Sequence, residues 1–123
     1  PDLARWQQWK ALWNIQMPSD CAACPSGPKY FIDYYRMKYP ESRFGLVSFD
    51  YDIVIAPFMS LTLGDFHEQL YEMADHVAYT WPNARYFFLA GASHVGLALP
   101  TPALETWIKQ LVEDDPAWDN HSP

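Results

Sequence analysis

Two apolar runs of strand length, separated by a helical pattern, constrain the fold of this chain more than any other feature. The runs are RFGLVSF at residues 43–49 and ARYFFLA at residues 84–90, and neither alternates between polar and apolar side chains. Strands without that alternation are typical of a sheet that is covered on both faces, and strands joined through a helix are typically parallel. The pattern therefore predicts an α/β fold, a mostly parallel sheet flanked by helices.

Helix signals surround the two strands. The clearest helix is predicted over residues 65–80, with Asp65 as its cap, because four apolar residues recur there at spacings of three and four. These four are Phe66, Leu70, Met73 and Val77. Further helices are expected over residues 3–14, 29–39 and 102–113. Residues 53–66 are ambiguous because Pro57 interrupts them, and we expect a loop with a short helical turn.

Composition limits the classes of partner. The chain has 123 residues, of which 50% are hydrophobic, and this suits one compact domain or one part of a larger domain. Its formal net charge is −7, so a nucleic-acid backbone would be repelled. No apolar run approaches the roughly 20 residues that cross a bilayer, so we expect no membrane span.

The two cysteines form the pattern Cys21-Ala-Ala-Cys24 in a loop rich in proline, serine and glycine. A redox pair normally opens a helix directly after a strand, and this loop does not. A structural disulfide is favoured, with free thiols, metal-bound thiols and redox chemistry as the alternatives. Two cysteines without a neighbouring histidine cannot complete a four-ligand zinc site. An oxidised pair would indicate a secreted or periplasmic protein.

The N-terminal helix pattern carries an aromatic face. Leu3, Trp6, Trp9, Leu12 and Trp13 recur there at helical spacing. Core packing is the favoured interpretation. The alternative is a surface that binds a ligand.

Both predicted strands end in a residue with acid/base capacity. Asp50 follows the first strand, and His94 follows the second after a few small residues. The carboxyl ends of parallel strands meet at one edge of the sheet, where functional side chains gather. A carboxylate that orients an imidazole makes up two thirds of a hydrolytic triad. We therefore expect a hydrogen bond between Asp50 and His94, with Asp52 as the competing acid.

Structural roles for these residues stay open. A loop histidine can bond to backbone carbonyls, and an aspartate after a strand can cap a turn or helix. The third member of a triad is missing, because Gly91-Ala-Ser93-His94-Val95 lacks the second glycine of G-x-S-x-G, and Ser93 is therefore not the expected nucleophile. His67 and His76 are expected to be solvated on the polar side of their helix. His121 lies in a polar tail, and no metal site is expected.

Four segments together resemble the C-terminal part of the pectin acetylesterase-like carboxylesterases, which are secreted α/β-hydrolases. The segments are ALWNIQMPSDCAAC at residues 11–24, YPESRFGLVSFDYD at 39–52, NARYFFLAGASHVGL at 83–97 and TWIKQLVEDDPAW at 106–118. The resemblance implies that residues 1–123 are one segment, the C-terminal portion of an α/β-hydrolase-like sheet. It implies that Asp50 is the triad acid and His94 the general base.

The same resemblance implies that the nucleophilic serine and the oxyanion hole lie upstream of these residues or on a companion chain. The ester substrate stays open between an acetylated polysaccharide, a fatty acyl ester and a polyester, and no cofactor is expected. The alternative function is a non-catalytic module that binds carbohydrate or a protein partner through aromatic side chains. Those side chains are Trp6, Trp9, Trp13, Tyr30, Tyr34 and Tyr35.

Overall fold

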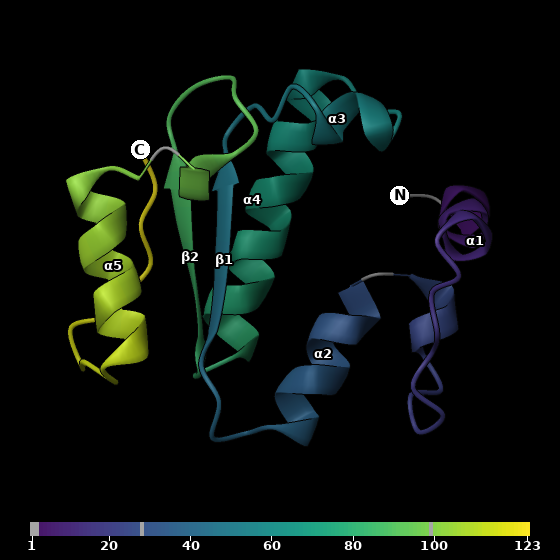
Figure 1. Ribbon diagram of the computed structural model, residues 1–123, viewed down its shortest axis with the longest axis horizontal. Coiled ribbons are helices and arrows are strands. Elements are labelled where there is room, and N and C mark those ends of the chain that lie inside the picture. Colours follow the sequence, from purple (N-terminus) through teal and green to yellow (C-terminus); the bar gives the residue numbers. More distant parts are fainter. Residues whose placement is uncertain (1–2, 28, 99) are drawn as a thin grey trace. The chain divides into compact units, whose positions relative to one another are not determined.

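The computed structural model describes residues 3–27, 29–98 and 100–123 (Figure 1). The chain divides into two compact units, Pro1–Ser42 and Arg43–Pro123. The second unit holds both strands, so it is the unit that positions the candidate site.

The first unit consists of two helices and a short 3₁₀ turn. Helix α1 covers Leu3–Leu12, η1 covers Cys24–Ser26 and α2 covers Lys29–Lys38. The aromatic face of α1 is divided: Trp6 and Trp9 are buried, whereas Trp13 is 63% exposed and stacks on Trp9. Core packing, the favoured interpretation of this face, therefore holds for two of its three tryptophans.

The two cysteines belong to the small core of this unit. The sulfur atoms of Cys21 and Cys24 lie at disulfide-bonding distance, and both residues are buried with Tyr34. The indole of Trp6 donates to the Cys24 carbonyl at 3.3 Å. The cysteine pair therefore lies in the core of this unit, and the Trp6 bond connects its loop to helix α1.

The second unit is built on a two-stranded parallel sheet. Strand β1 covers Phe44–Phe49 and β2 covers Ala84–Leu89, and their register runs from Phe44 opposite Ala84 to Phe49 opposite Leu89. Between the strands lie α3, Ile55–Phe58, and α4, Leu63–Thr80. After β2 come the 3₁₀ turn η2, Gly96–Ala98, and α5, Pro102–Val112. The predicted order of strands and helices is confirmed, and so is the parallel pairing.

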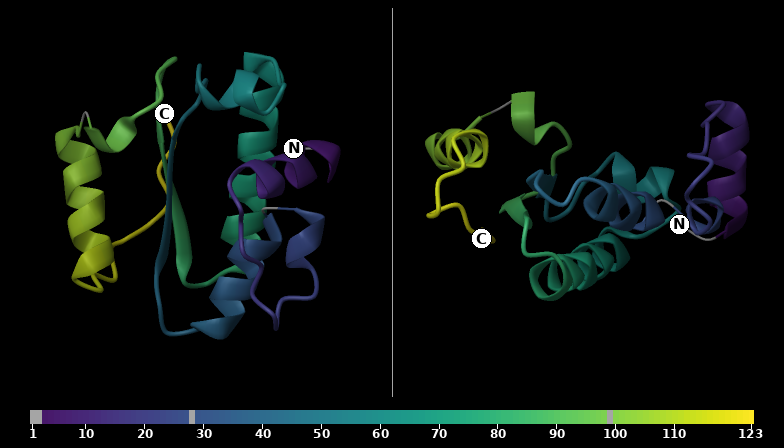
Figure 2. Two further views of the ribbon diagram at one scale, coloured as in Figure 1. Left: turned by 45° about the vertical axis from the view of Figure 1, so that its right-hand side comes forward. Right: turned by 90° about the horizontal axis from the view of Figure 1, so that it is seen from below.

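The sheet separates two apolar clusters, each under one helix. The cluster under α4 is centred on Phe66, Leu70 and Phe88, and Leu46 packs against it. The cluster under α5 contains Phe87, Leu104, Trp107 and Trp118, and Val47 packs against it. Even-numbered strand residues thus face α4 and odd-numbered ones face α5, because successive side chains of a strand point to opposite faces. Figure 2 shows the two helices on opposite sides of the strands.

A capping box fixes the N-terminal end of α4. Thr62 is the N-cap of α4: its hydroxyl accepts from the Asp65 amide, and the Asp65 carboxylate accepts from the Thr62 amide. The prediction of Asp65 as the cap is therefore wrong by three residues, because Asp65 is the reciprocal partner in a capping box.

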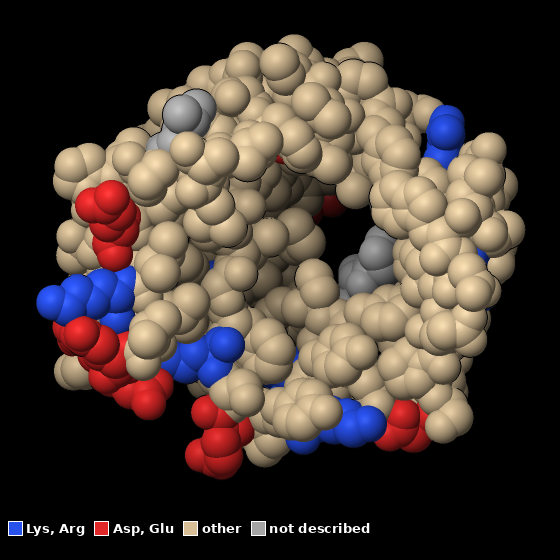
Figure 3. All heavy atoms as spheres, in the orientation of Figure 1, with Lys and Arg blue, Asp and Glu red and all other residues tan. Residues whose placement is uncertain are grey.

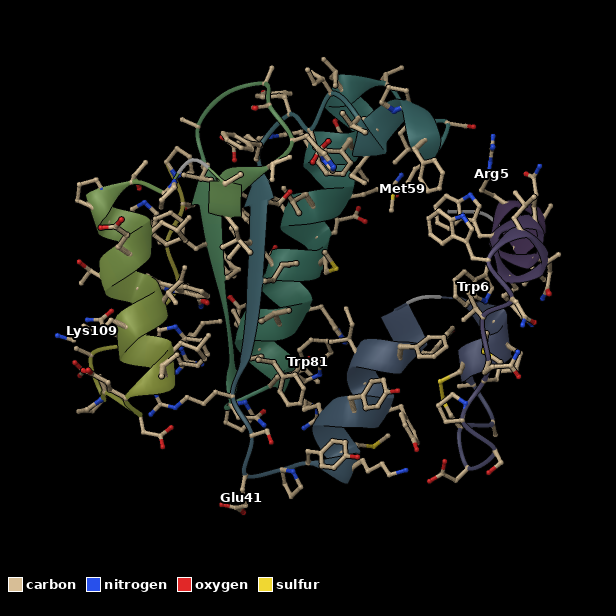
Figure 4. All side chains as sticks on the ribbon, in the orientation of Figure 1. Arg5, Trp6, Glu41, Met59, Trp81 and Lys109 are labelled. Carbon is tan, nitrogen blue, oxygen red and sulfur yellow. A yellow bond between two sulfur atoms is a disulfide. The ribbon has the colours of Figure 1, made fainter. Side chains whose placement is uncertain are left out.

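On α5, Lys109 points away from the sheet, as the amphipathic pattern of this helix requires (Figure 4).

The C-terminal tail pairs with the second edge of β2. The His121 amide donates to the Tyr86 carbonyl and the Phe88 amide donates to the His121 carbonyl, each at 2.9 Å. The His121 ring stacks on Phe87. His121 is thus bonded into the sheet edge rather than lying in a free polar tail.

Within the described residues, no helix has the length and apolar character needed to cross a membrane.

We expect the cysteine pair to be oxidised in the native protein. Reduction should lower the free energy of unfolding of the first unit by about 2 kcal/mol, because closing so short a loop removes little entropy from the unfolded chain. Alkylation without reductant, followed by mass spectrometry, should label neither Cys21 nor Cys24. Two freely labelled thiols would contradict the expectation, and Cys21→Ser/Cys24→Ser should reproduce the effect of reduction.

Candidate active site

The loops that follow the two strands lie together at the carboxyl edge of the sheet. The Asp50 amide donates to the Leu89 carbonyl at 3.0 Å, and the Tyr51 amide donates to the Gly91 carbonyl at 3.3 Å. These bonds extend the ladder beyond the strands, because the parallel register brings both loops to the same end. Gly91 has a φ of 111°, a conformation that side chains with a Cβ rarely adopt.

An aspartate and a histidine meet at this edge. The His94 Nδ1 atom lies 2.9 Å from Asp52 Oδ2 and 3.1 Å from Asp52 Oδ1. The prediction that a carboxylate orients His94 is therefore confirmed in kind, but the choice of Asp50 over Asp52 as its hydrogen-bond partner is wrong. The imidazole is 39% exposed, whereas the carboxylate is 5% exposed.

Strand geometry explains why Asp50 does not reach His94. Asp50 continues the even-numbered row of β1, which faces α4, and its Oδ1 atom accepts a hydrogen bond from the Tyr71 hydroxyl at 3.2 Å. Asp52 lies past the strand, where the chain has begun to turn. The period of two along a strand puts Leu46, Ser48 and Asp50 on one face, and the structure shows that this face packs under α4.

Backbone amides hold the Asp52 carboxylate in place. Its Oδ1 atom accepts from the amides of Val54 and Ile55 at 2.9 and 2.7 Å. Aspartate often bonds to amides two or three residues ahead, and such bonds stabilise the charged form of a buried carboxylate. Asp52 is thus fixed both by its own loop and by His94.

The second nitrogen of His94 remains available. Within the described residues, no hydrogen bond uses Nε2. A neutral imidazole that donates through Nδ1–H to Asp52 presents an unprotonated Nε2, which can accept a proton. Ser93 adjoins His94 in sequence, and no hydroxyl among the described residues is hydrogen-bonded to the ring. The described part of the chain therefore brings together a histidine and a buried carboxylate, and no serine hydroxyl of that part is bonded to the histidine.

A second cluster lies beside this pair. The His67 ring is stacked on the Tyr51 ring, with centroids 4.7 Å apart. It also contacts the Tyr71 ring, with centroids 4.6 Å apart. His67 was expected to be solvated, and that expectation is wrong: its Nδ1 atom is buried without a hydrogen-bond partner in the described chain. Burial, and next the charge of Asp50, raise the pKa of Tyr71. The sequence offered no signal for this cluster beyond the helical spacing of four between His67 and Tyr71.

The segments that carry the pair are otherwise uncharged. Residues 53–64 and 86–104 contain no Asp, Glu, Lys or Arg, although the whole chain has 23 such residues, 15 acidic and 8 basic. Figure 3 shows this end of the second unit, uppermost in the view, without acidic or basic side chains on the presented face. Of the two stretches that flank the pair, neither therefore adds a charged side chain to those of Asp50 and Asp52. Among the described residues, no group of three His, Cys, Asp or Glu could hold a metal ion.

A scan against protein-family models, a search of curated proteins and a search of solved structures each return no match to this chain. The resemblance to the pectin acetylesterase-like carboxylesterases accordingly stays a prediction from the sequence. The class of the fold, a two-stranded parallel sheet flanked by helices, stands on the structure itself.

The bond between Asp50 and Tyr71 predicts a pH effect. Because two causes of the raised Tyr71 pKa come from Asp50, Asp50→Asn should lower that pKa, and burial should keep it above the ordinary value. The stabilising effect of the bond is present below about pH 10, the pKa of an unfolded tyrosine, and is lost as pH rises through the raised pKa. Titration of ¹³C-labelled tyrosine by NMR measures the Tyr71 pKa, and Tyr71→Phe assigns the signal. An unchanged Tyr71 pKa in Asp50→Asn would contradict the geometry.

The Asp52 contact predicts the tautomer of His94. When the His94 imidazole is neutral, its proton should be on Nδ1, because the Asp52 carboxylate can only accept a hydrogen bond. Asp52→Asn should increase the Nε2–H form, since the asparagine amide can donate to Nδ1, whereas Asp50→Asn should leave the tautomer unchanged. The ¹⁵N chemical shifts of both ring nitrogens report the two forms. If Asp50→Asn changes the tautomer and Asp52→Asn does not, the pairing described above is incorrect.

Proposed function

We propose that this chain is the acid- and histidine-bearing part of a serine-dependent carboxylic ester hydrolase of the α/β-hydrolase type. The observation that carries the proposal is the hydrogen bond between Asp52 and His94 at the carboxyl edge of a parallel sheet. In α/β-hydrolases the acid precedes the histidine along the chain, as it does here, and the serine precedes both. The nucleophile and the oxyanion hole would come from an upstream segment or a companion chain.

The geometry supports separate roles for His94, Asp52 and Asp50. The Nε2 atom of His94 would take the proton of the attacking serine hydroxyl and return it to the leaving alkoxide. Asp52 would hold the ring through Nδ1–H and stabilise the imidazolium that forms. In the second half of the reaction, the same nitrogen would deprotonate the water that releases the acid. Asp50, bonded to Tyr71, would take no direct part in these proton transfers.

The burial of half of the candidate aromatic residues counts against the sugar-binding form of the non-catalytic module. Of the six aromatic residues considered for a binding surface, three are buried. These three are Trp6, Trp9 and Tyr34. Tyr34 is further bonded to Asp20 and Lys38, and these contacts account for its polar group. A continuous aromatic platform of the kind that binds sugar rings would need those faces to be open.

The uncharged surroundings of the pair support an ester without a strong negative charge. A polyanionic substrate such as a galacturonate chain gains affinity from basic side chains, and residues 53–64 and 86–104 contain none. A fatty acyl ester or a polyester fits these segments better. The secreted or periplasmic location belongs to the proposal as well, and it is supported by the cysteine pair.

Turnover of a p-nitrophenyl ester by the polypeptide extended upstream tests the proposal. Asp52→Asn should lower kcat by up to about 10⁴-fold, the scale of a tautomer-breaking change in the serine-protease triad, and His94→Ala should abolish hydrolysis. Asp50→Asn should have a much smaller effect. The melting temperature should fall only modestly in His94→Ala, because the exposed ring packs little and Asp52 keeps its bonds to the amides of Val54 and Ile55.

Two results would overturn this function. One is an extended polypeptide that retains most of its turnover after His94→Ala. The other is a fluorophosphonate probe, which labels activated serines, attaching to Ser93 of the 123-residue chain. The expected result is that the probe labels a serine outside residues 1–123 and that the label disappears in His94→Ala.

A further inference from the structure

Helix α4 holds both residues that directly precede Asp52. The Tyr71 hydroxyl donates to the Asp50 carboxylate at 3.2 Å. The His67 ring covers Tyr51, with ring planes only 7° apart. Asp50 is buried, whereas Tyr51 is partly exposed, so α4 holds one residue from within the core and the next at its surface.

These contacts continue into the core of the second unit. His67 and Tyr71 are four residues apart on α4, and such residues lie on the same face of a helix. The Tyr71 ring meets Phe88 of β2 edge-on, with centroids 5.3 Å apart, and Phe88 is fully buried. The row of rings therefore connects the strand that leads to His94 with the loop that carries Asp52.

The other bonds of the Asp52 loop hold it within itself, in the plane of the sheet and at its far end. The amides of Val54 and Ile55 bond to the Asp52 carboxylate, and the amide of Ala56, which is buried in the cluster under α4, bonds to the Asp52 carbonyl. The amides of Asp50 and Tyr51 bond to the β2 side within the plane of the sheet. Bonds in that plane do little to oppose tilting of the loop out of the plane, and the side chains of α4 contact it from that side.

The unused nitrogen of His67 indicates which property of the ring matters. Its Nδ1 atom is buried and has no hydrogen-bond partner among the described residues. A buried polar atom without a partner is unfavourable, so the ring contributes through stacking and not through a hydrogen bond. Phenylalanine should therefore replace His67 in this role, and alanine should not.

We propose that Tyr71 and His67 are positioning residues that keep the Asp52 carboxylate in register with His94. Tyr71 acts through the Asp50 carboxylate, and His67 acts through the Tyr51 ring. The inference concerns the Asp52–His94 hydrogen bond itself, and it rests on the proposed function only for the effect on turnover.

The Nδ1–H proton of His94 provides a direct readout in the 123-residue chain. This proton should give a low-field NMR signal while it is hydrogen-bonded to the Asp52 carboxylate. Tyr71→Phe should reduce or broaden that signal, and His67→Ala should do the same. His67→Phe should restore it. The matched control is Tyr86→Phe, which removes a hydroxyl from another tyrosine packed against the same cluster and should leave the signal unchanged.

The outcomes decide the proposal separately from the function. If Tyr71→Phe and His67→Ala both keep the full signal while Asp52→Asn removes it, the positioning role is wrong. If His67→Phe loses the signal as fully as His67→Ala, stacking is not the cause. Unfolding by denaturant, measured for each variant, shows whether loss of the signal exceeds any loss of folded protein. In the extended polypeptide, Tyr71→Phe should lower kcat about tenfold with little change in KM; absence of turnover in the unsubstituted polypeptide would refute the function and leave the NMR result standing.

Discussion

The parallel pairing of β1 with β2 is the constraint on which the candidate site depends. Two parallel strands in register end at the same edge, so the loops that follow them must meet. In an antiparallel pair of the same strands, Asp52 and His94 would lie at opposite ends of the sheet. The covering helices maintain this pairing, because each buries one face of a sheet of only two strands. The topology therefore brings Asp52 and His94 to the same edge, and the loops only turn the two side chains toward each other.

Two buried carboxylates at one edge need compensation. Removing a charge from water is costly unless hydrogen bonds or opposite charges replace the solvent. Asp52 receives two backbone amides and the His94 ring, and Asp50 receives the Tyr71 hydroxyl. Each acid therefore has its own partners on a different side, and this keeps their roles apart. One acid faces an exposed histidine, and the other anchors the loop to α4.

The periodic parts of the fold could be predicted from the sequence, whereas the contacts between elements could not. The runs at residues 43–49 and 84–90 and the spacing in residues 65–80 report local burial, and the structure confirms all three. The partner of His94 depends on where the chain turns after β1, and two aspartates separated by one residue, Asp50 and Asp52, left that choice open. His67 was misjudged because the ring stacked on it, that of Tyr51, comes from the loop after β1 and not from its own helix. The position of His94 at the carboxyl edge could be predicted, because the small residues around it follow a buried strand and form a loop there.

In the proposed enzyme, the Nε2 atom of His94 faces a serine supplied by sequence outside this chain. A crystal structure of the extended polypeptide, with a phosphonate covalently attached to its reactive serine, tests this most directly. We expect the serine Oγ atom to lie within about 3.2 Å of the His94 Nε2 atom, or slightly farther when the adduct displaces the ring. The His94 Nδ1 atom should remain bonded to Asp52. A modified serine bonded to a different histidine, with His94 turned away from it, would contradict the account.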